Sequence, residues 1–138
     1  MPDFPHSVHF DVRDYECDLQ GIVNNANYQH YIEHARHLYL RELGIDFAAL
    51  SARGANLVVI RIEVDYLSTL RSGDQFVVRT RLERASRVRF VFVQEIDRSD
   101  GKPVARAKVF GATMDANGRP TRPPAEVEAV MPPSASAV

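Results

Sequence analysis

The chain has 138 residues, of which 17 are Lys or Arg and 18 are Asp or Glu, so its formal net charge is −1. This length predicts one domain, residues 1–138, whose core is large enough to fold without disulfides or a structural metal. The balanced charge gives no overall field favouring nucleic acid or an anionic membrane surface, and the single cysteine, Cys17, excludes an internal disulfide and a cysteine-rich zinc site.

The first elements expected are a strand and a long helix. Apolar and polar residues alternate over 6–14, which predicts a strand, and a loop through Gly21 follows. Apolar residues then recur at three- and four-residue steps over 25–43, as on a helix with one buried side. Asn24 or Asn25 suits its N-cap. The residues expected on the buried side are Tyr28, Tyr31, Ile32, Ala35, Leu38, Tyr39 and Leu43.

A short second helix is expected next, and after Gly54 the apolar period changes from helical to alternating. Four further strands are predicted, at 57–67, 76–83, 87–98 and 104–116. The turns between them are short, so neighbouring strands must run antiparallel. The Pro-rich remainder, about 120–138, is expected to be a partly disordered tail.

Two of these strands carry more specific expectations. In strand 57–67, strict alternation places Val58, Ile60, Ile62, Val64 and Tyr66 on one face. Strand 87–98 carries apolar residues on both faces, which suggests that a second subunit covers the far side of the sheet. One long helix beside five strands predicts an α+β layer arrangement.

The chemistry points to the loop before the long helix. Asp18 lies seven residues before Asn25, and a helix start exposes free N–H groups with a partial positive charge. Gly21 allows a sharp turn between the two. A carboxylate near such a helix start could attack a polarised carbonyl or activate water, which suits ester or thioester hydrolysis.

The run "VRDYECDLQGIVNNANYQHYIEHAR", 12–36, resembles the signature of hotdog-fold acyl-CoA thioesterases of the 4-hydroxybenzoyl-CoA thioesterase type. The matching residues are Asp18, Gly21, Ile22, Val23, Tyr28, Glu33, Ala35 and Arg36. Residues 23–26, "VNNA", look closer to relatives that hydrolyse fatty acyl-CoA and to plant acyl-carrier-protein thioesterases. The resemblance implies a hotdog fold, in which a five-stranded antiparallel sheet wraps the long helix.

The resemblance also implies roles for the residues. Asp18 would act as nucleophile or general base, and the backbone N–H of Asn25 would hold the thioester oxygen. Gly21, Ile22 and Val23 would shape the loop that brings these groups together. A second chain would complete the pocket, in a homodimer or a tetramer. Many members carry an aromatic residue or His where this chain has Asn24 and Asn25, which leaves substrate preference open.

Other polar groups are candidates for substrate binding, besides Asn24 and Tyr28. Glu33 could orient water or substrate, or form a helix salt bridge with His37 or Arg36. The arginines Arg84, Arg87 and Arg89 cluster between two strands, where they could hold coenzyme A phosphates or form a solvated strand end. His30, His34 and His37 share a helix side, which is interpreted as a solvated face rather than a zinc site.

The expected function is hydrolysis of a fatty or aromatic acyl-CoA to free acid and coenzyme A, in the cytoplasm and without a metal or cofactor. Acyl carrier protein remains possible as the carrier. One alternative is a non-catalytic acyl-thioester-binding protein. Another is a hotdog hydratase or dehydratase, which is disfavoured because no His occurs between Asp14 and Asn27.

Overall fold

The computed structural model describes residues 4–132. It contains one long helix, two short helices and six strands, with a single 3₁₀ turn before the long helix. In chain order these are β1 (His6–Asp11), η1 (Asp14–Glu16), α1 (Asn25–Glu42), α2 (Phe47–Ala52), β2 (Asn56–Tyr66), β3 (Gln75–Arg84), β4 (Arg89–Arg98), β5 (Pro103–Met114), β6 (Pro120–Thr121) and α3 (Ala125–Val130).

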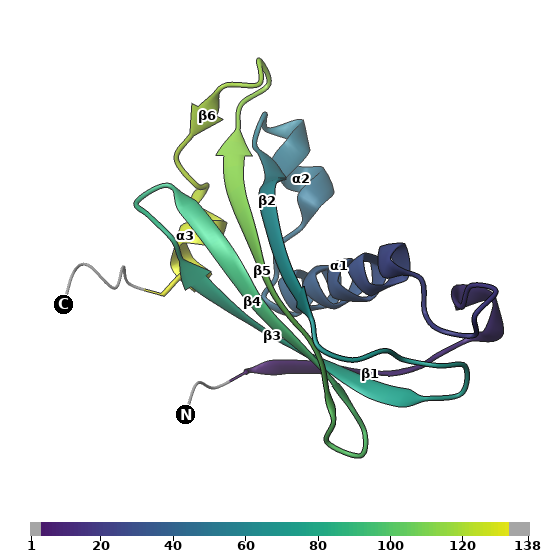
Figure 1. Cartoon of the computed structure of the whole chain (residues 1–138). Helices are drawn as coiled ribbons and strands as arrows, with labels where there is room; N and C mark the ends of the chain where they lie inside the picture. The colour runs from purple at the N-terminus through teal and green to yellow at the C-terminus, as the bar shows by residue number, and fades with distance from the viewer. Residues whose placement is uncertain (1–3, 133–138) are drawn as a thin grey trace.

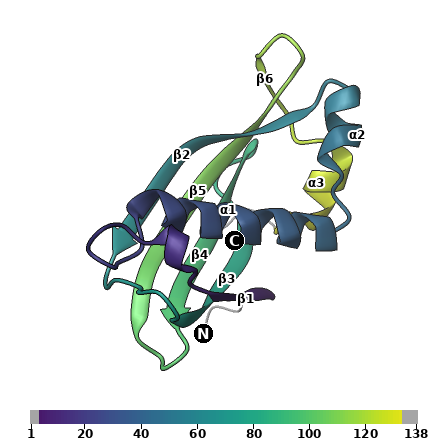
Figure 2. The same ribbon diagram turned by 90° about the vertical axis from the view of Figure 1, so that its right-hand side faces the viewer.

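The strands form one antiparallel sheet in the order β1-β3-β4-β5-β2, and β6 pairs with β5. The sheet curves around α1, which lies across its inner face (Figure 1). Figure 2 shows the loop that precedes α1 at one end of the helix and α2 and α3 near the other. The expected α+β hotdog arrangement is therefore confirmed, with six strands rather than five.

The additional strand and α3 correct the expectation of a tail after residue 120. β6 pairs Thr121 with Thr113 of β5, and α3 follows directly. Val127 of α3 and Met131 behind it are buried in the main core, so this segment closes one end of the molecule. Residues 133–138, also assigned to the tail, lie outside the described residues.

The core lies between α1 and the inner face of the sheet. Five of the seven residues expected on the buried side of the helix are buried, while Leu38 and Leu43 are half-buried. Leu40 and Arg36 are buried as well. The curved sheet covers a wider arc of the helix than the apolar stripe alone, which explains why a charged residue lies inside.

The expected alternation in β2 is wrong in its first half, because the strand contains a bulge. Val59 pairs with Gly111 and Arg61 with Phe110, so Ile60 is an extra residue in the ladder. A bulge changes which side chains face inward. As a result Val59 shares the helix-facing side with Ile62, which pairs with the buried Val109.

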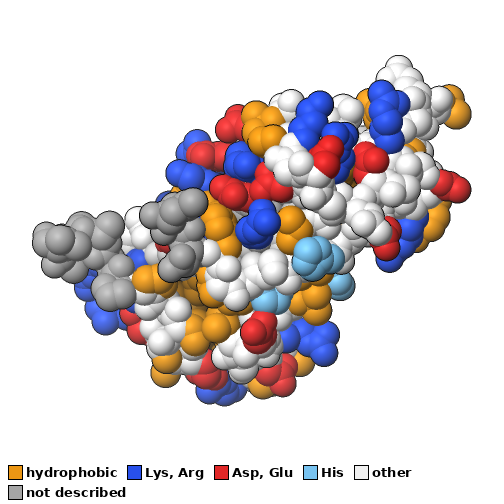
Figure 3. All heavy atoms as spheres, turned by 90° about the horizontal axis from the view of Figure 1, so that it is seen from below, with side chains coloured by type: hydrophobic (Ala, Val, Ile, Leu, Met, Phe, Trp, Pro, Cys, Tyr) orange, Lys and Arg blue, Asp and Glu red, His pale blue; other side chains and the backbone are white. Residues whose placement is uncertain are grey.

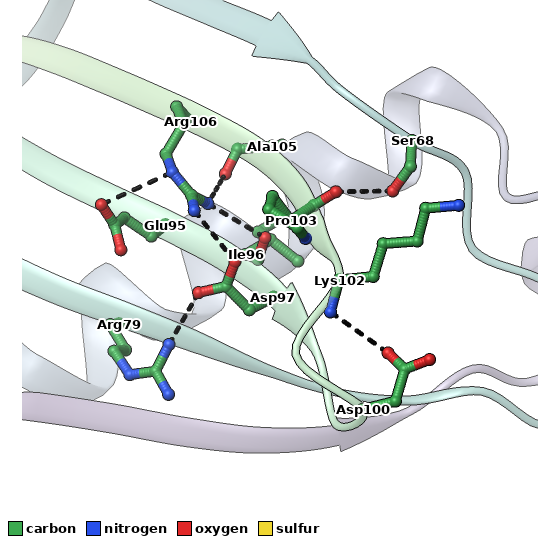
Figure 4. Close-up of polar contacts among 10 residues, drawn as sticks. All are labelled: Ser68, Arg79, Glu95, Ile96, Asp97, Asp100, Lys102, Pro103, Ala105 and Arg106. Atoms are coloured by element: carbon green, nitrogen blue, oxygen red, sulfur yellow. Dashed lines mark hydrogen bonds and ion pairs between the residues drawn. The ribbon is translucent and has the colours of Figure 1, made fainter.

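The outer face of the sheet carries a network of charged side chains (Figure 4). Asp97 accepts hydrogen bonds from Arg79 at 2.7 Å and from Arg106 at 3.0 Å, and Arg106 also lies 3.5 Å from Glu95. The alternation of β4 places the apolar residues Val91 and Val93 on the same face as Glu95 and Asp97. Coverage of this face by a second subunit stays a prediction.

Charged side chains of both signs are intermixed over the face of the molecule drawn in Figure 3. Of the helices within residues 4–132, none has the length and apolar character needed to span a lipid bilayer.

Candidate active site

The loop before α1 folds into a small hairpin that displays Asp18 at its tip. Cys17 and Val23 form an antiparallel bridge, and the N–H of Asp18 donates to the carbonyl of Ile22 at 2.9 Å. The N–H of Gly21 donates back to the carbonyl of Asp18 at 3.0 Å. Gly21 has a φ of +78°, a left-handed conformation that a glycine adopts without steric cost. The turn therefore depends on Gly21, as the sequence indicated.

The carboxylate of Asp18 is exposed in a single chain. Its Oδ1 accepts a hydrogen bond from the N–H of Gln20 at 2.8 Å, which fixes the orientation of the carboxylate within the turn. Leu19, the next residue, is fully exposed at the hairpin tip. An acid held by its own turn and open on its other side can reach a ligand.

Asn24 is the N-cap of α1, and its two oxygens accept hydrogen bonds from two of the backbone N–H groups at the helix start. Its side-chain oxygen accepts from the N–H of Ala26 at 2.9 Å, and its carbonyl accepts from the N–H of Asn27 at 2.9 Å. Within residues 4–132, the N–H of Asn25 has no assigned acceptor. This amide lies at the positive end of the helix dipole and can bind an oxyanion.

Glu16 joins the hairpin to the helix start. Its carbonyl accepts from the N–H of Asn24 at 3.2 Å and from Nδ2 of Asn27 at 2.8 Å. Its buried side chain accepts from the hydroxyl of Tyr31 and from the N–H of Arg13, both at 2.8 Å. Asp18 is two residues further along the hairpin, about 7 Å at the rise of an extended chain. The hairpin that carries Asp18 is therefore tied to the first turn of α1 through Glu16.

Glu16 is a residue of this site that was not predicted from the sequence. The sequence pattern that could have indicated Glu16 is an acidic residue two positions before Asp18, followed by a helix with a tyrosine on its buried side. Burial raises the pKa of Tyr31, and its hydrogen bond to Glu16 raises it further, because both favour the neutral phenol.

Two predicted substrate-binding residues, Val23 and Tyr28, lie in the core below the hairpin. The N–H of Val23 donates to the carbonyl of Leu70 at 2.8 Å, and the N–H of Leu70 donates to the hydroxyl of Tyr28 at 2.9 Å. Burial is the main cause that raises the pKa of Tyr28. The structure therefore brings these residues to the site as supports of the loop, while Ile22 is half-buried and bridges to Arg71.

A groove of about 390 Å³ begins beside the helix start and runs between α1 and β2. Glu33, another predicted site residue, lines it on the helix side. The groove is lined by Ala26, Gln29 and Glu33 of α1 and by Val59, Ile62 and Val109 of the sheet. Its apolar sheet side and its position next to Asn25 suit an acyl chain.

The predicted arginine cluster lies at the far end of the sheet from Asp18. β1 ends at Asp11, which pairs with Gln75 at the start of β3, and the chain continues from there towards the hairpin. Arg84 lies at the other end of β3, where it pairs with Phe90. Gln75 and Arg84 are nine residue steps apart along β3, about 30 Å at the rise of a strand. Within one chain the structure does not bring Arg84, Arg87 and Arg89 together with Asp18.

Arg84 is also engaged elsewhere. Its side chain donates to the carbonyl of Pro132 at 3.0 Å and pairs with Glu128 of α3. It therefore helps to hold the C-terminal segment on the sheet. Arg87 and Arg89 are exposed.

The three histidines of α1 do not gather into a metal site. His30 contacts Asn27 at 3.2 Å, His34 packs on Phe10, and His37 packs on Phe47. Over the part of the chain that the structure describes, no group of three or more His, Cys, Asp or Glu could hold a metal ion.

Comparison with known proteins identifies the family of this chain. The model of the thioesterase-like superfamily matches residues 12–131. The acyl-acyl carrier protein thioesterase ATL2, chloroplastic, of Arabidopsis thaliana is 39% identical over 123 residues, which are 88% of this chain and 65% of that protein. This chain thus spans slightly less than two thirds of the ATL2 protein.

Two further likenesses cover nearly the whole of both chains. The acyl-CoA thioesterase YbgC of Haemophilus influenzae is 28% identical over 128 residues, 91% of this chain and 90% of that protein. The crystal structure of a hypothetical protein from Aquifex aeolicus superposes with a TM-score of 0.82 at 32% identity, covering 91% of this chain and 98% of the other. By its sequence and by its hotdog fold, this chain belongs to the thioesterase-like superfamily.

Proposed function

We propose that the protein hydrolyses an acyl thioester, with a fatty or aromatic acyl group, to a free acid and a thiol. Membership of the thioesterase-like superfamily supports this proposal. The names of its relatives include both an acyl-acyl carrier protein thioesterase and an acyl-CoA thioesterase. Coenzyme A is the proposed carrier, and acyl carrier protein is tested beside it.

One observation supports the proposal most strongly. The N–H of Asn25 has no acceptor among residues 4–132, and the hairpin that displays the Asp18 carboxylate is hydrogen-bonded to the same helix start. A thioester whose carbonyl oxygen binds this N–H becomes more electrophilic, and the negative charge that develops on the oxygen is stabilised there. The acyl chain then lies in the groove along α1.

Asp18 can complete the reaction in either of two ways. As a nucleophile it attacks the carbonyl carbon, the carbon–sulfur bond breaks, and water then hydrolyses the acyl anhydride on Asp18. As a general base it takes a proton from water, the hydroxide adds to the carbonyl carbon, and the departing thiolate is protonated. Both routes use only the protein and water.

We place the complete site in a homodimer, which could pair further into a tetramer. β2 is the last strand on its side of the sheet. Val59, Ile60, Ile62, Tyr66 and the adjacent Leu67 are all exposed in one chain. An apolar edge strand of this kind is suited to pairing with another chain. A second chain at this edge would close the groove beside Asn25.

The dimer also determines what the arginine cluster can do. Arg87 and Arg89 follow the Arg84 end of β3, which is about 30 Å from its Gln75 end, so we propose that they contact coenzyme A phosphates in the site of the second chain.

The test is thiol release by the purified protein from a panel of aliphatic and aromatic acyl-CoAs and an acyl carrier protein thioester, followed with a thiol-reactive dye. Release with turnover supports hydrolysis and identifies the acyl class and the carrier. Tight binding without release would instead indicate a non-catalytic binding protein. Loss of enoyl absorbance from crotonyl-CoA without release would indicate a hydratase.

A further inference from the structure

Arg36 of α1 is a buried cation that has no counter-ion among residues 4–132. Its exposed fraction is 7%, and burial lowers its pKa. Among residues 4–132, its side chain makes one hydrogen bond, which Nη1 donates to Oε1 of Gln94 at a long 3.4 Å. Gln94 cannot turn away, because its Nε2 donates to Thr80 and to the carbonyl of Ile32, each at 3.0 Å. A guanidinium has five N–H donors, so most of this group remains available.

No carboxylate lies within 4.0 Å of Arg36 among residues 4–132. The acid that influences it most is Glu33, one turn earlier on the helix, but the two do not form an ion pair although that spacing permits one. Glu33 is exposed. An isolated buried charge is strongly unfavourable, so a counter-charge from outside the chain is expected.

Glu33 and Arg36 line the same two cavities. Both residues border the groove of about 390 Å³ beside the helix start and a neighbouring cavity of about 210 Å³. Val59 of the exposed β2 edge borders both cavities as well. Glu33 and Arg36, which have no ion-pair partner among residues 4–132, therefore lie on the surface that the apolar edge strand continues.

A two-fold interface brings the same surface of two chains together, so each unpaired group on it meets a group of the other chain. When two helices pack antiparallel across such an axis, a residue at position i can meet i+3 of the other helix, and the reverse contact forms by symmetry. An acid and a base one helical turn apart are self-complementary in this arrangement.

We propose that Arg36 binds the carboxylate of Glu33 of a second copy of this chain, and that the symmetric pair forms at the same time. The inference rests on the homodimer proposed above and names the contact that specifies it. A bidentate arginine–carboxylate pair fixes orientation as well as adding energy. The two pairs would hold the two helices so that the groove beside each Asn25 is closed.

The test uses charge reversal and mixing, with dimer dissociation measured by analytical ultracentrifugation. Glu33→Arg alone places two arginines face to face, and Arg36→Glu alone places two glutamates face to face. Each variant is expected to dissociate at least tenfold more readily than the unmodified protein. In an equal mixture, each chain offers what the other lacks, so a heterodimer with both pairs restored should form.

Arg41→Glu is the matched control, because Arg41 is an exposed arginine of the same helix outside both cavities. It should leave dissociation unchanged. Equal dissociation of Glu33→Arg and the unmodified protein would overturn the proposal and would point to a carboxylate of a ligand on Arg36. A mixture no tighter than its separate components would overturn it as well.

Because Arg36 is buried, Arg36→Glu could fail to fold, which circular dichroism would reveal. Arg36→Gln then provides a second test with opposite signs. It should weaken the dimer in the unmodified background, where it removes an attraction, and strengthen it in the Glu33→Arg background, where it removes a repulsion. The same sign in both backgrounds would contradict the pairing. These measurements need no substrate, so they stand apart from the thiol-release assay.

Discussion

At the residue scale, the hairpin contains two carboxylates with different surroundings. Asp18 is exposed at the tip, whereas Glu16 is buried and accepts hydrogen bonds from Tyr31 and the Arg13 backbone. The first can meet a substrate, and the second holds the first in place. The sequence indicates Asp18 as a candidate because its type and spacing match a known signature, and its catalytic role stays a prediction. Glu16 could not be predicted, because its role depends on contacts with a helix residue fifteen positions away.

Glu16→Ala should therefore lower kcat about tenfold with a smaller change in KM, since it moves Asp18 without removing a substrate contact. It should also lower the free energy of unfolding by about 1–3 kcal/mol, because it leaves the buried Tyr31 hydroxyl without its acceptor. Steady-state thiol release and urea denaturation measure the two effects.

Glu16→Gln provides the control, since its amide oxygen can still accept from Tyr31. It should recover most of kcat. If both variants behaved alike and kept normal kcat, Glu16 would not position the catalytic group.

At the element scale, the start of α1 depends on its cap. Asn24→Ala removes the side chain that accepts from the N–H of Ala26 and should lower the free energy of unfolding by about 1 kcal/mol. Asn24→Ser keeps an N-cap acceptor and should lose a few tenths or less. Urea denaturation of the unmodified protein and the two variants measures these changes. An equal loss of unfolding free energy in both variants would show that the side-chain hydrogen bond of Asn24 does not stabilise the helix start.

The elements themselves were largely predictable, and the departures have physical reasons. Helix α1 and the strands follow their apolar periods, and the tight turns between strands impose the antiparallel order. The bulge at Ile60 was not predictable, because a run of apolar residues reads equally well in two registers. The burial of Arg36 was not predictable either, because arginine side chains are normally exposed.

At the scale of the whole molecule, the segment after residue 120 shows a limit of composition. Its prolines suggested a tail, yet α3 buries Val127 against the core, and Arg84 holds it through Glu128. Whether such a segment packs depends on a surface that the rest of the fold creates. The contact with a second subunit is equally hard to predict from the sequence, because no single chain contains both halves of an interface.

The stability of the whole fold should decrease in alkaline solution. Burial raises the pKa of Tyr28, Tyr31 and Tyr39 above the ordinary value of 10.0. Above pH 10 the unfolded chain therefore binds fewer protons than the folded one, so stability is complete below that pH and is lost as pH rises further. Tm measured from neutral pH to above pH 11 should show this decrease.

Tyr39→Phe removes one of these ionisations and should make the decrease shallower. Tyr15→Phe is the control, because Tyr15 is 77% exposed. An identical pH dependence in Tyr39→Phe and the unmodified protein would show that ionisation of this buried phenol does not control alkaline unfolding.

Hydrolysis by this protein depends most on the carboxylate at the hairpin tip, so the decisive measurement is kcat/KM for thiol release by Asp18→Asn, with Asp11→Asn as the matched control on β1. Asp18→Asn should lower kcat/KM by roughly 10²–10⁴-fold with an unchanged circular dichroism spectrum, whereas Asp11→Asn should keep normal activity. Activity of Asp18→Asn within about tenfold of the unmodified protein would show that Asp18 is not the reacting group, because such a group typically contributes at least about a hundredfold.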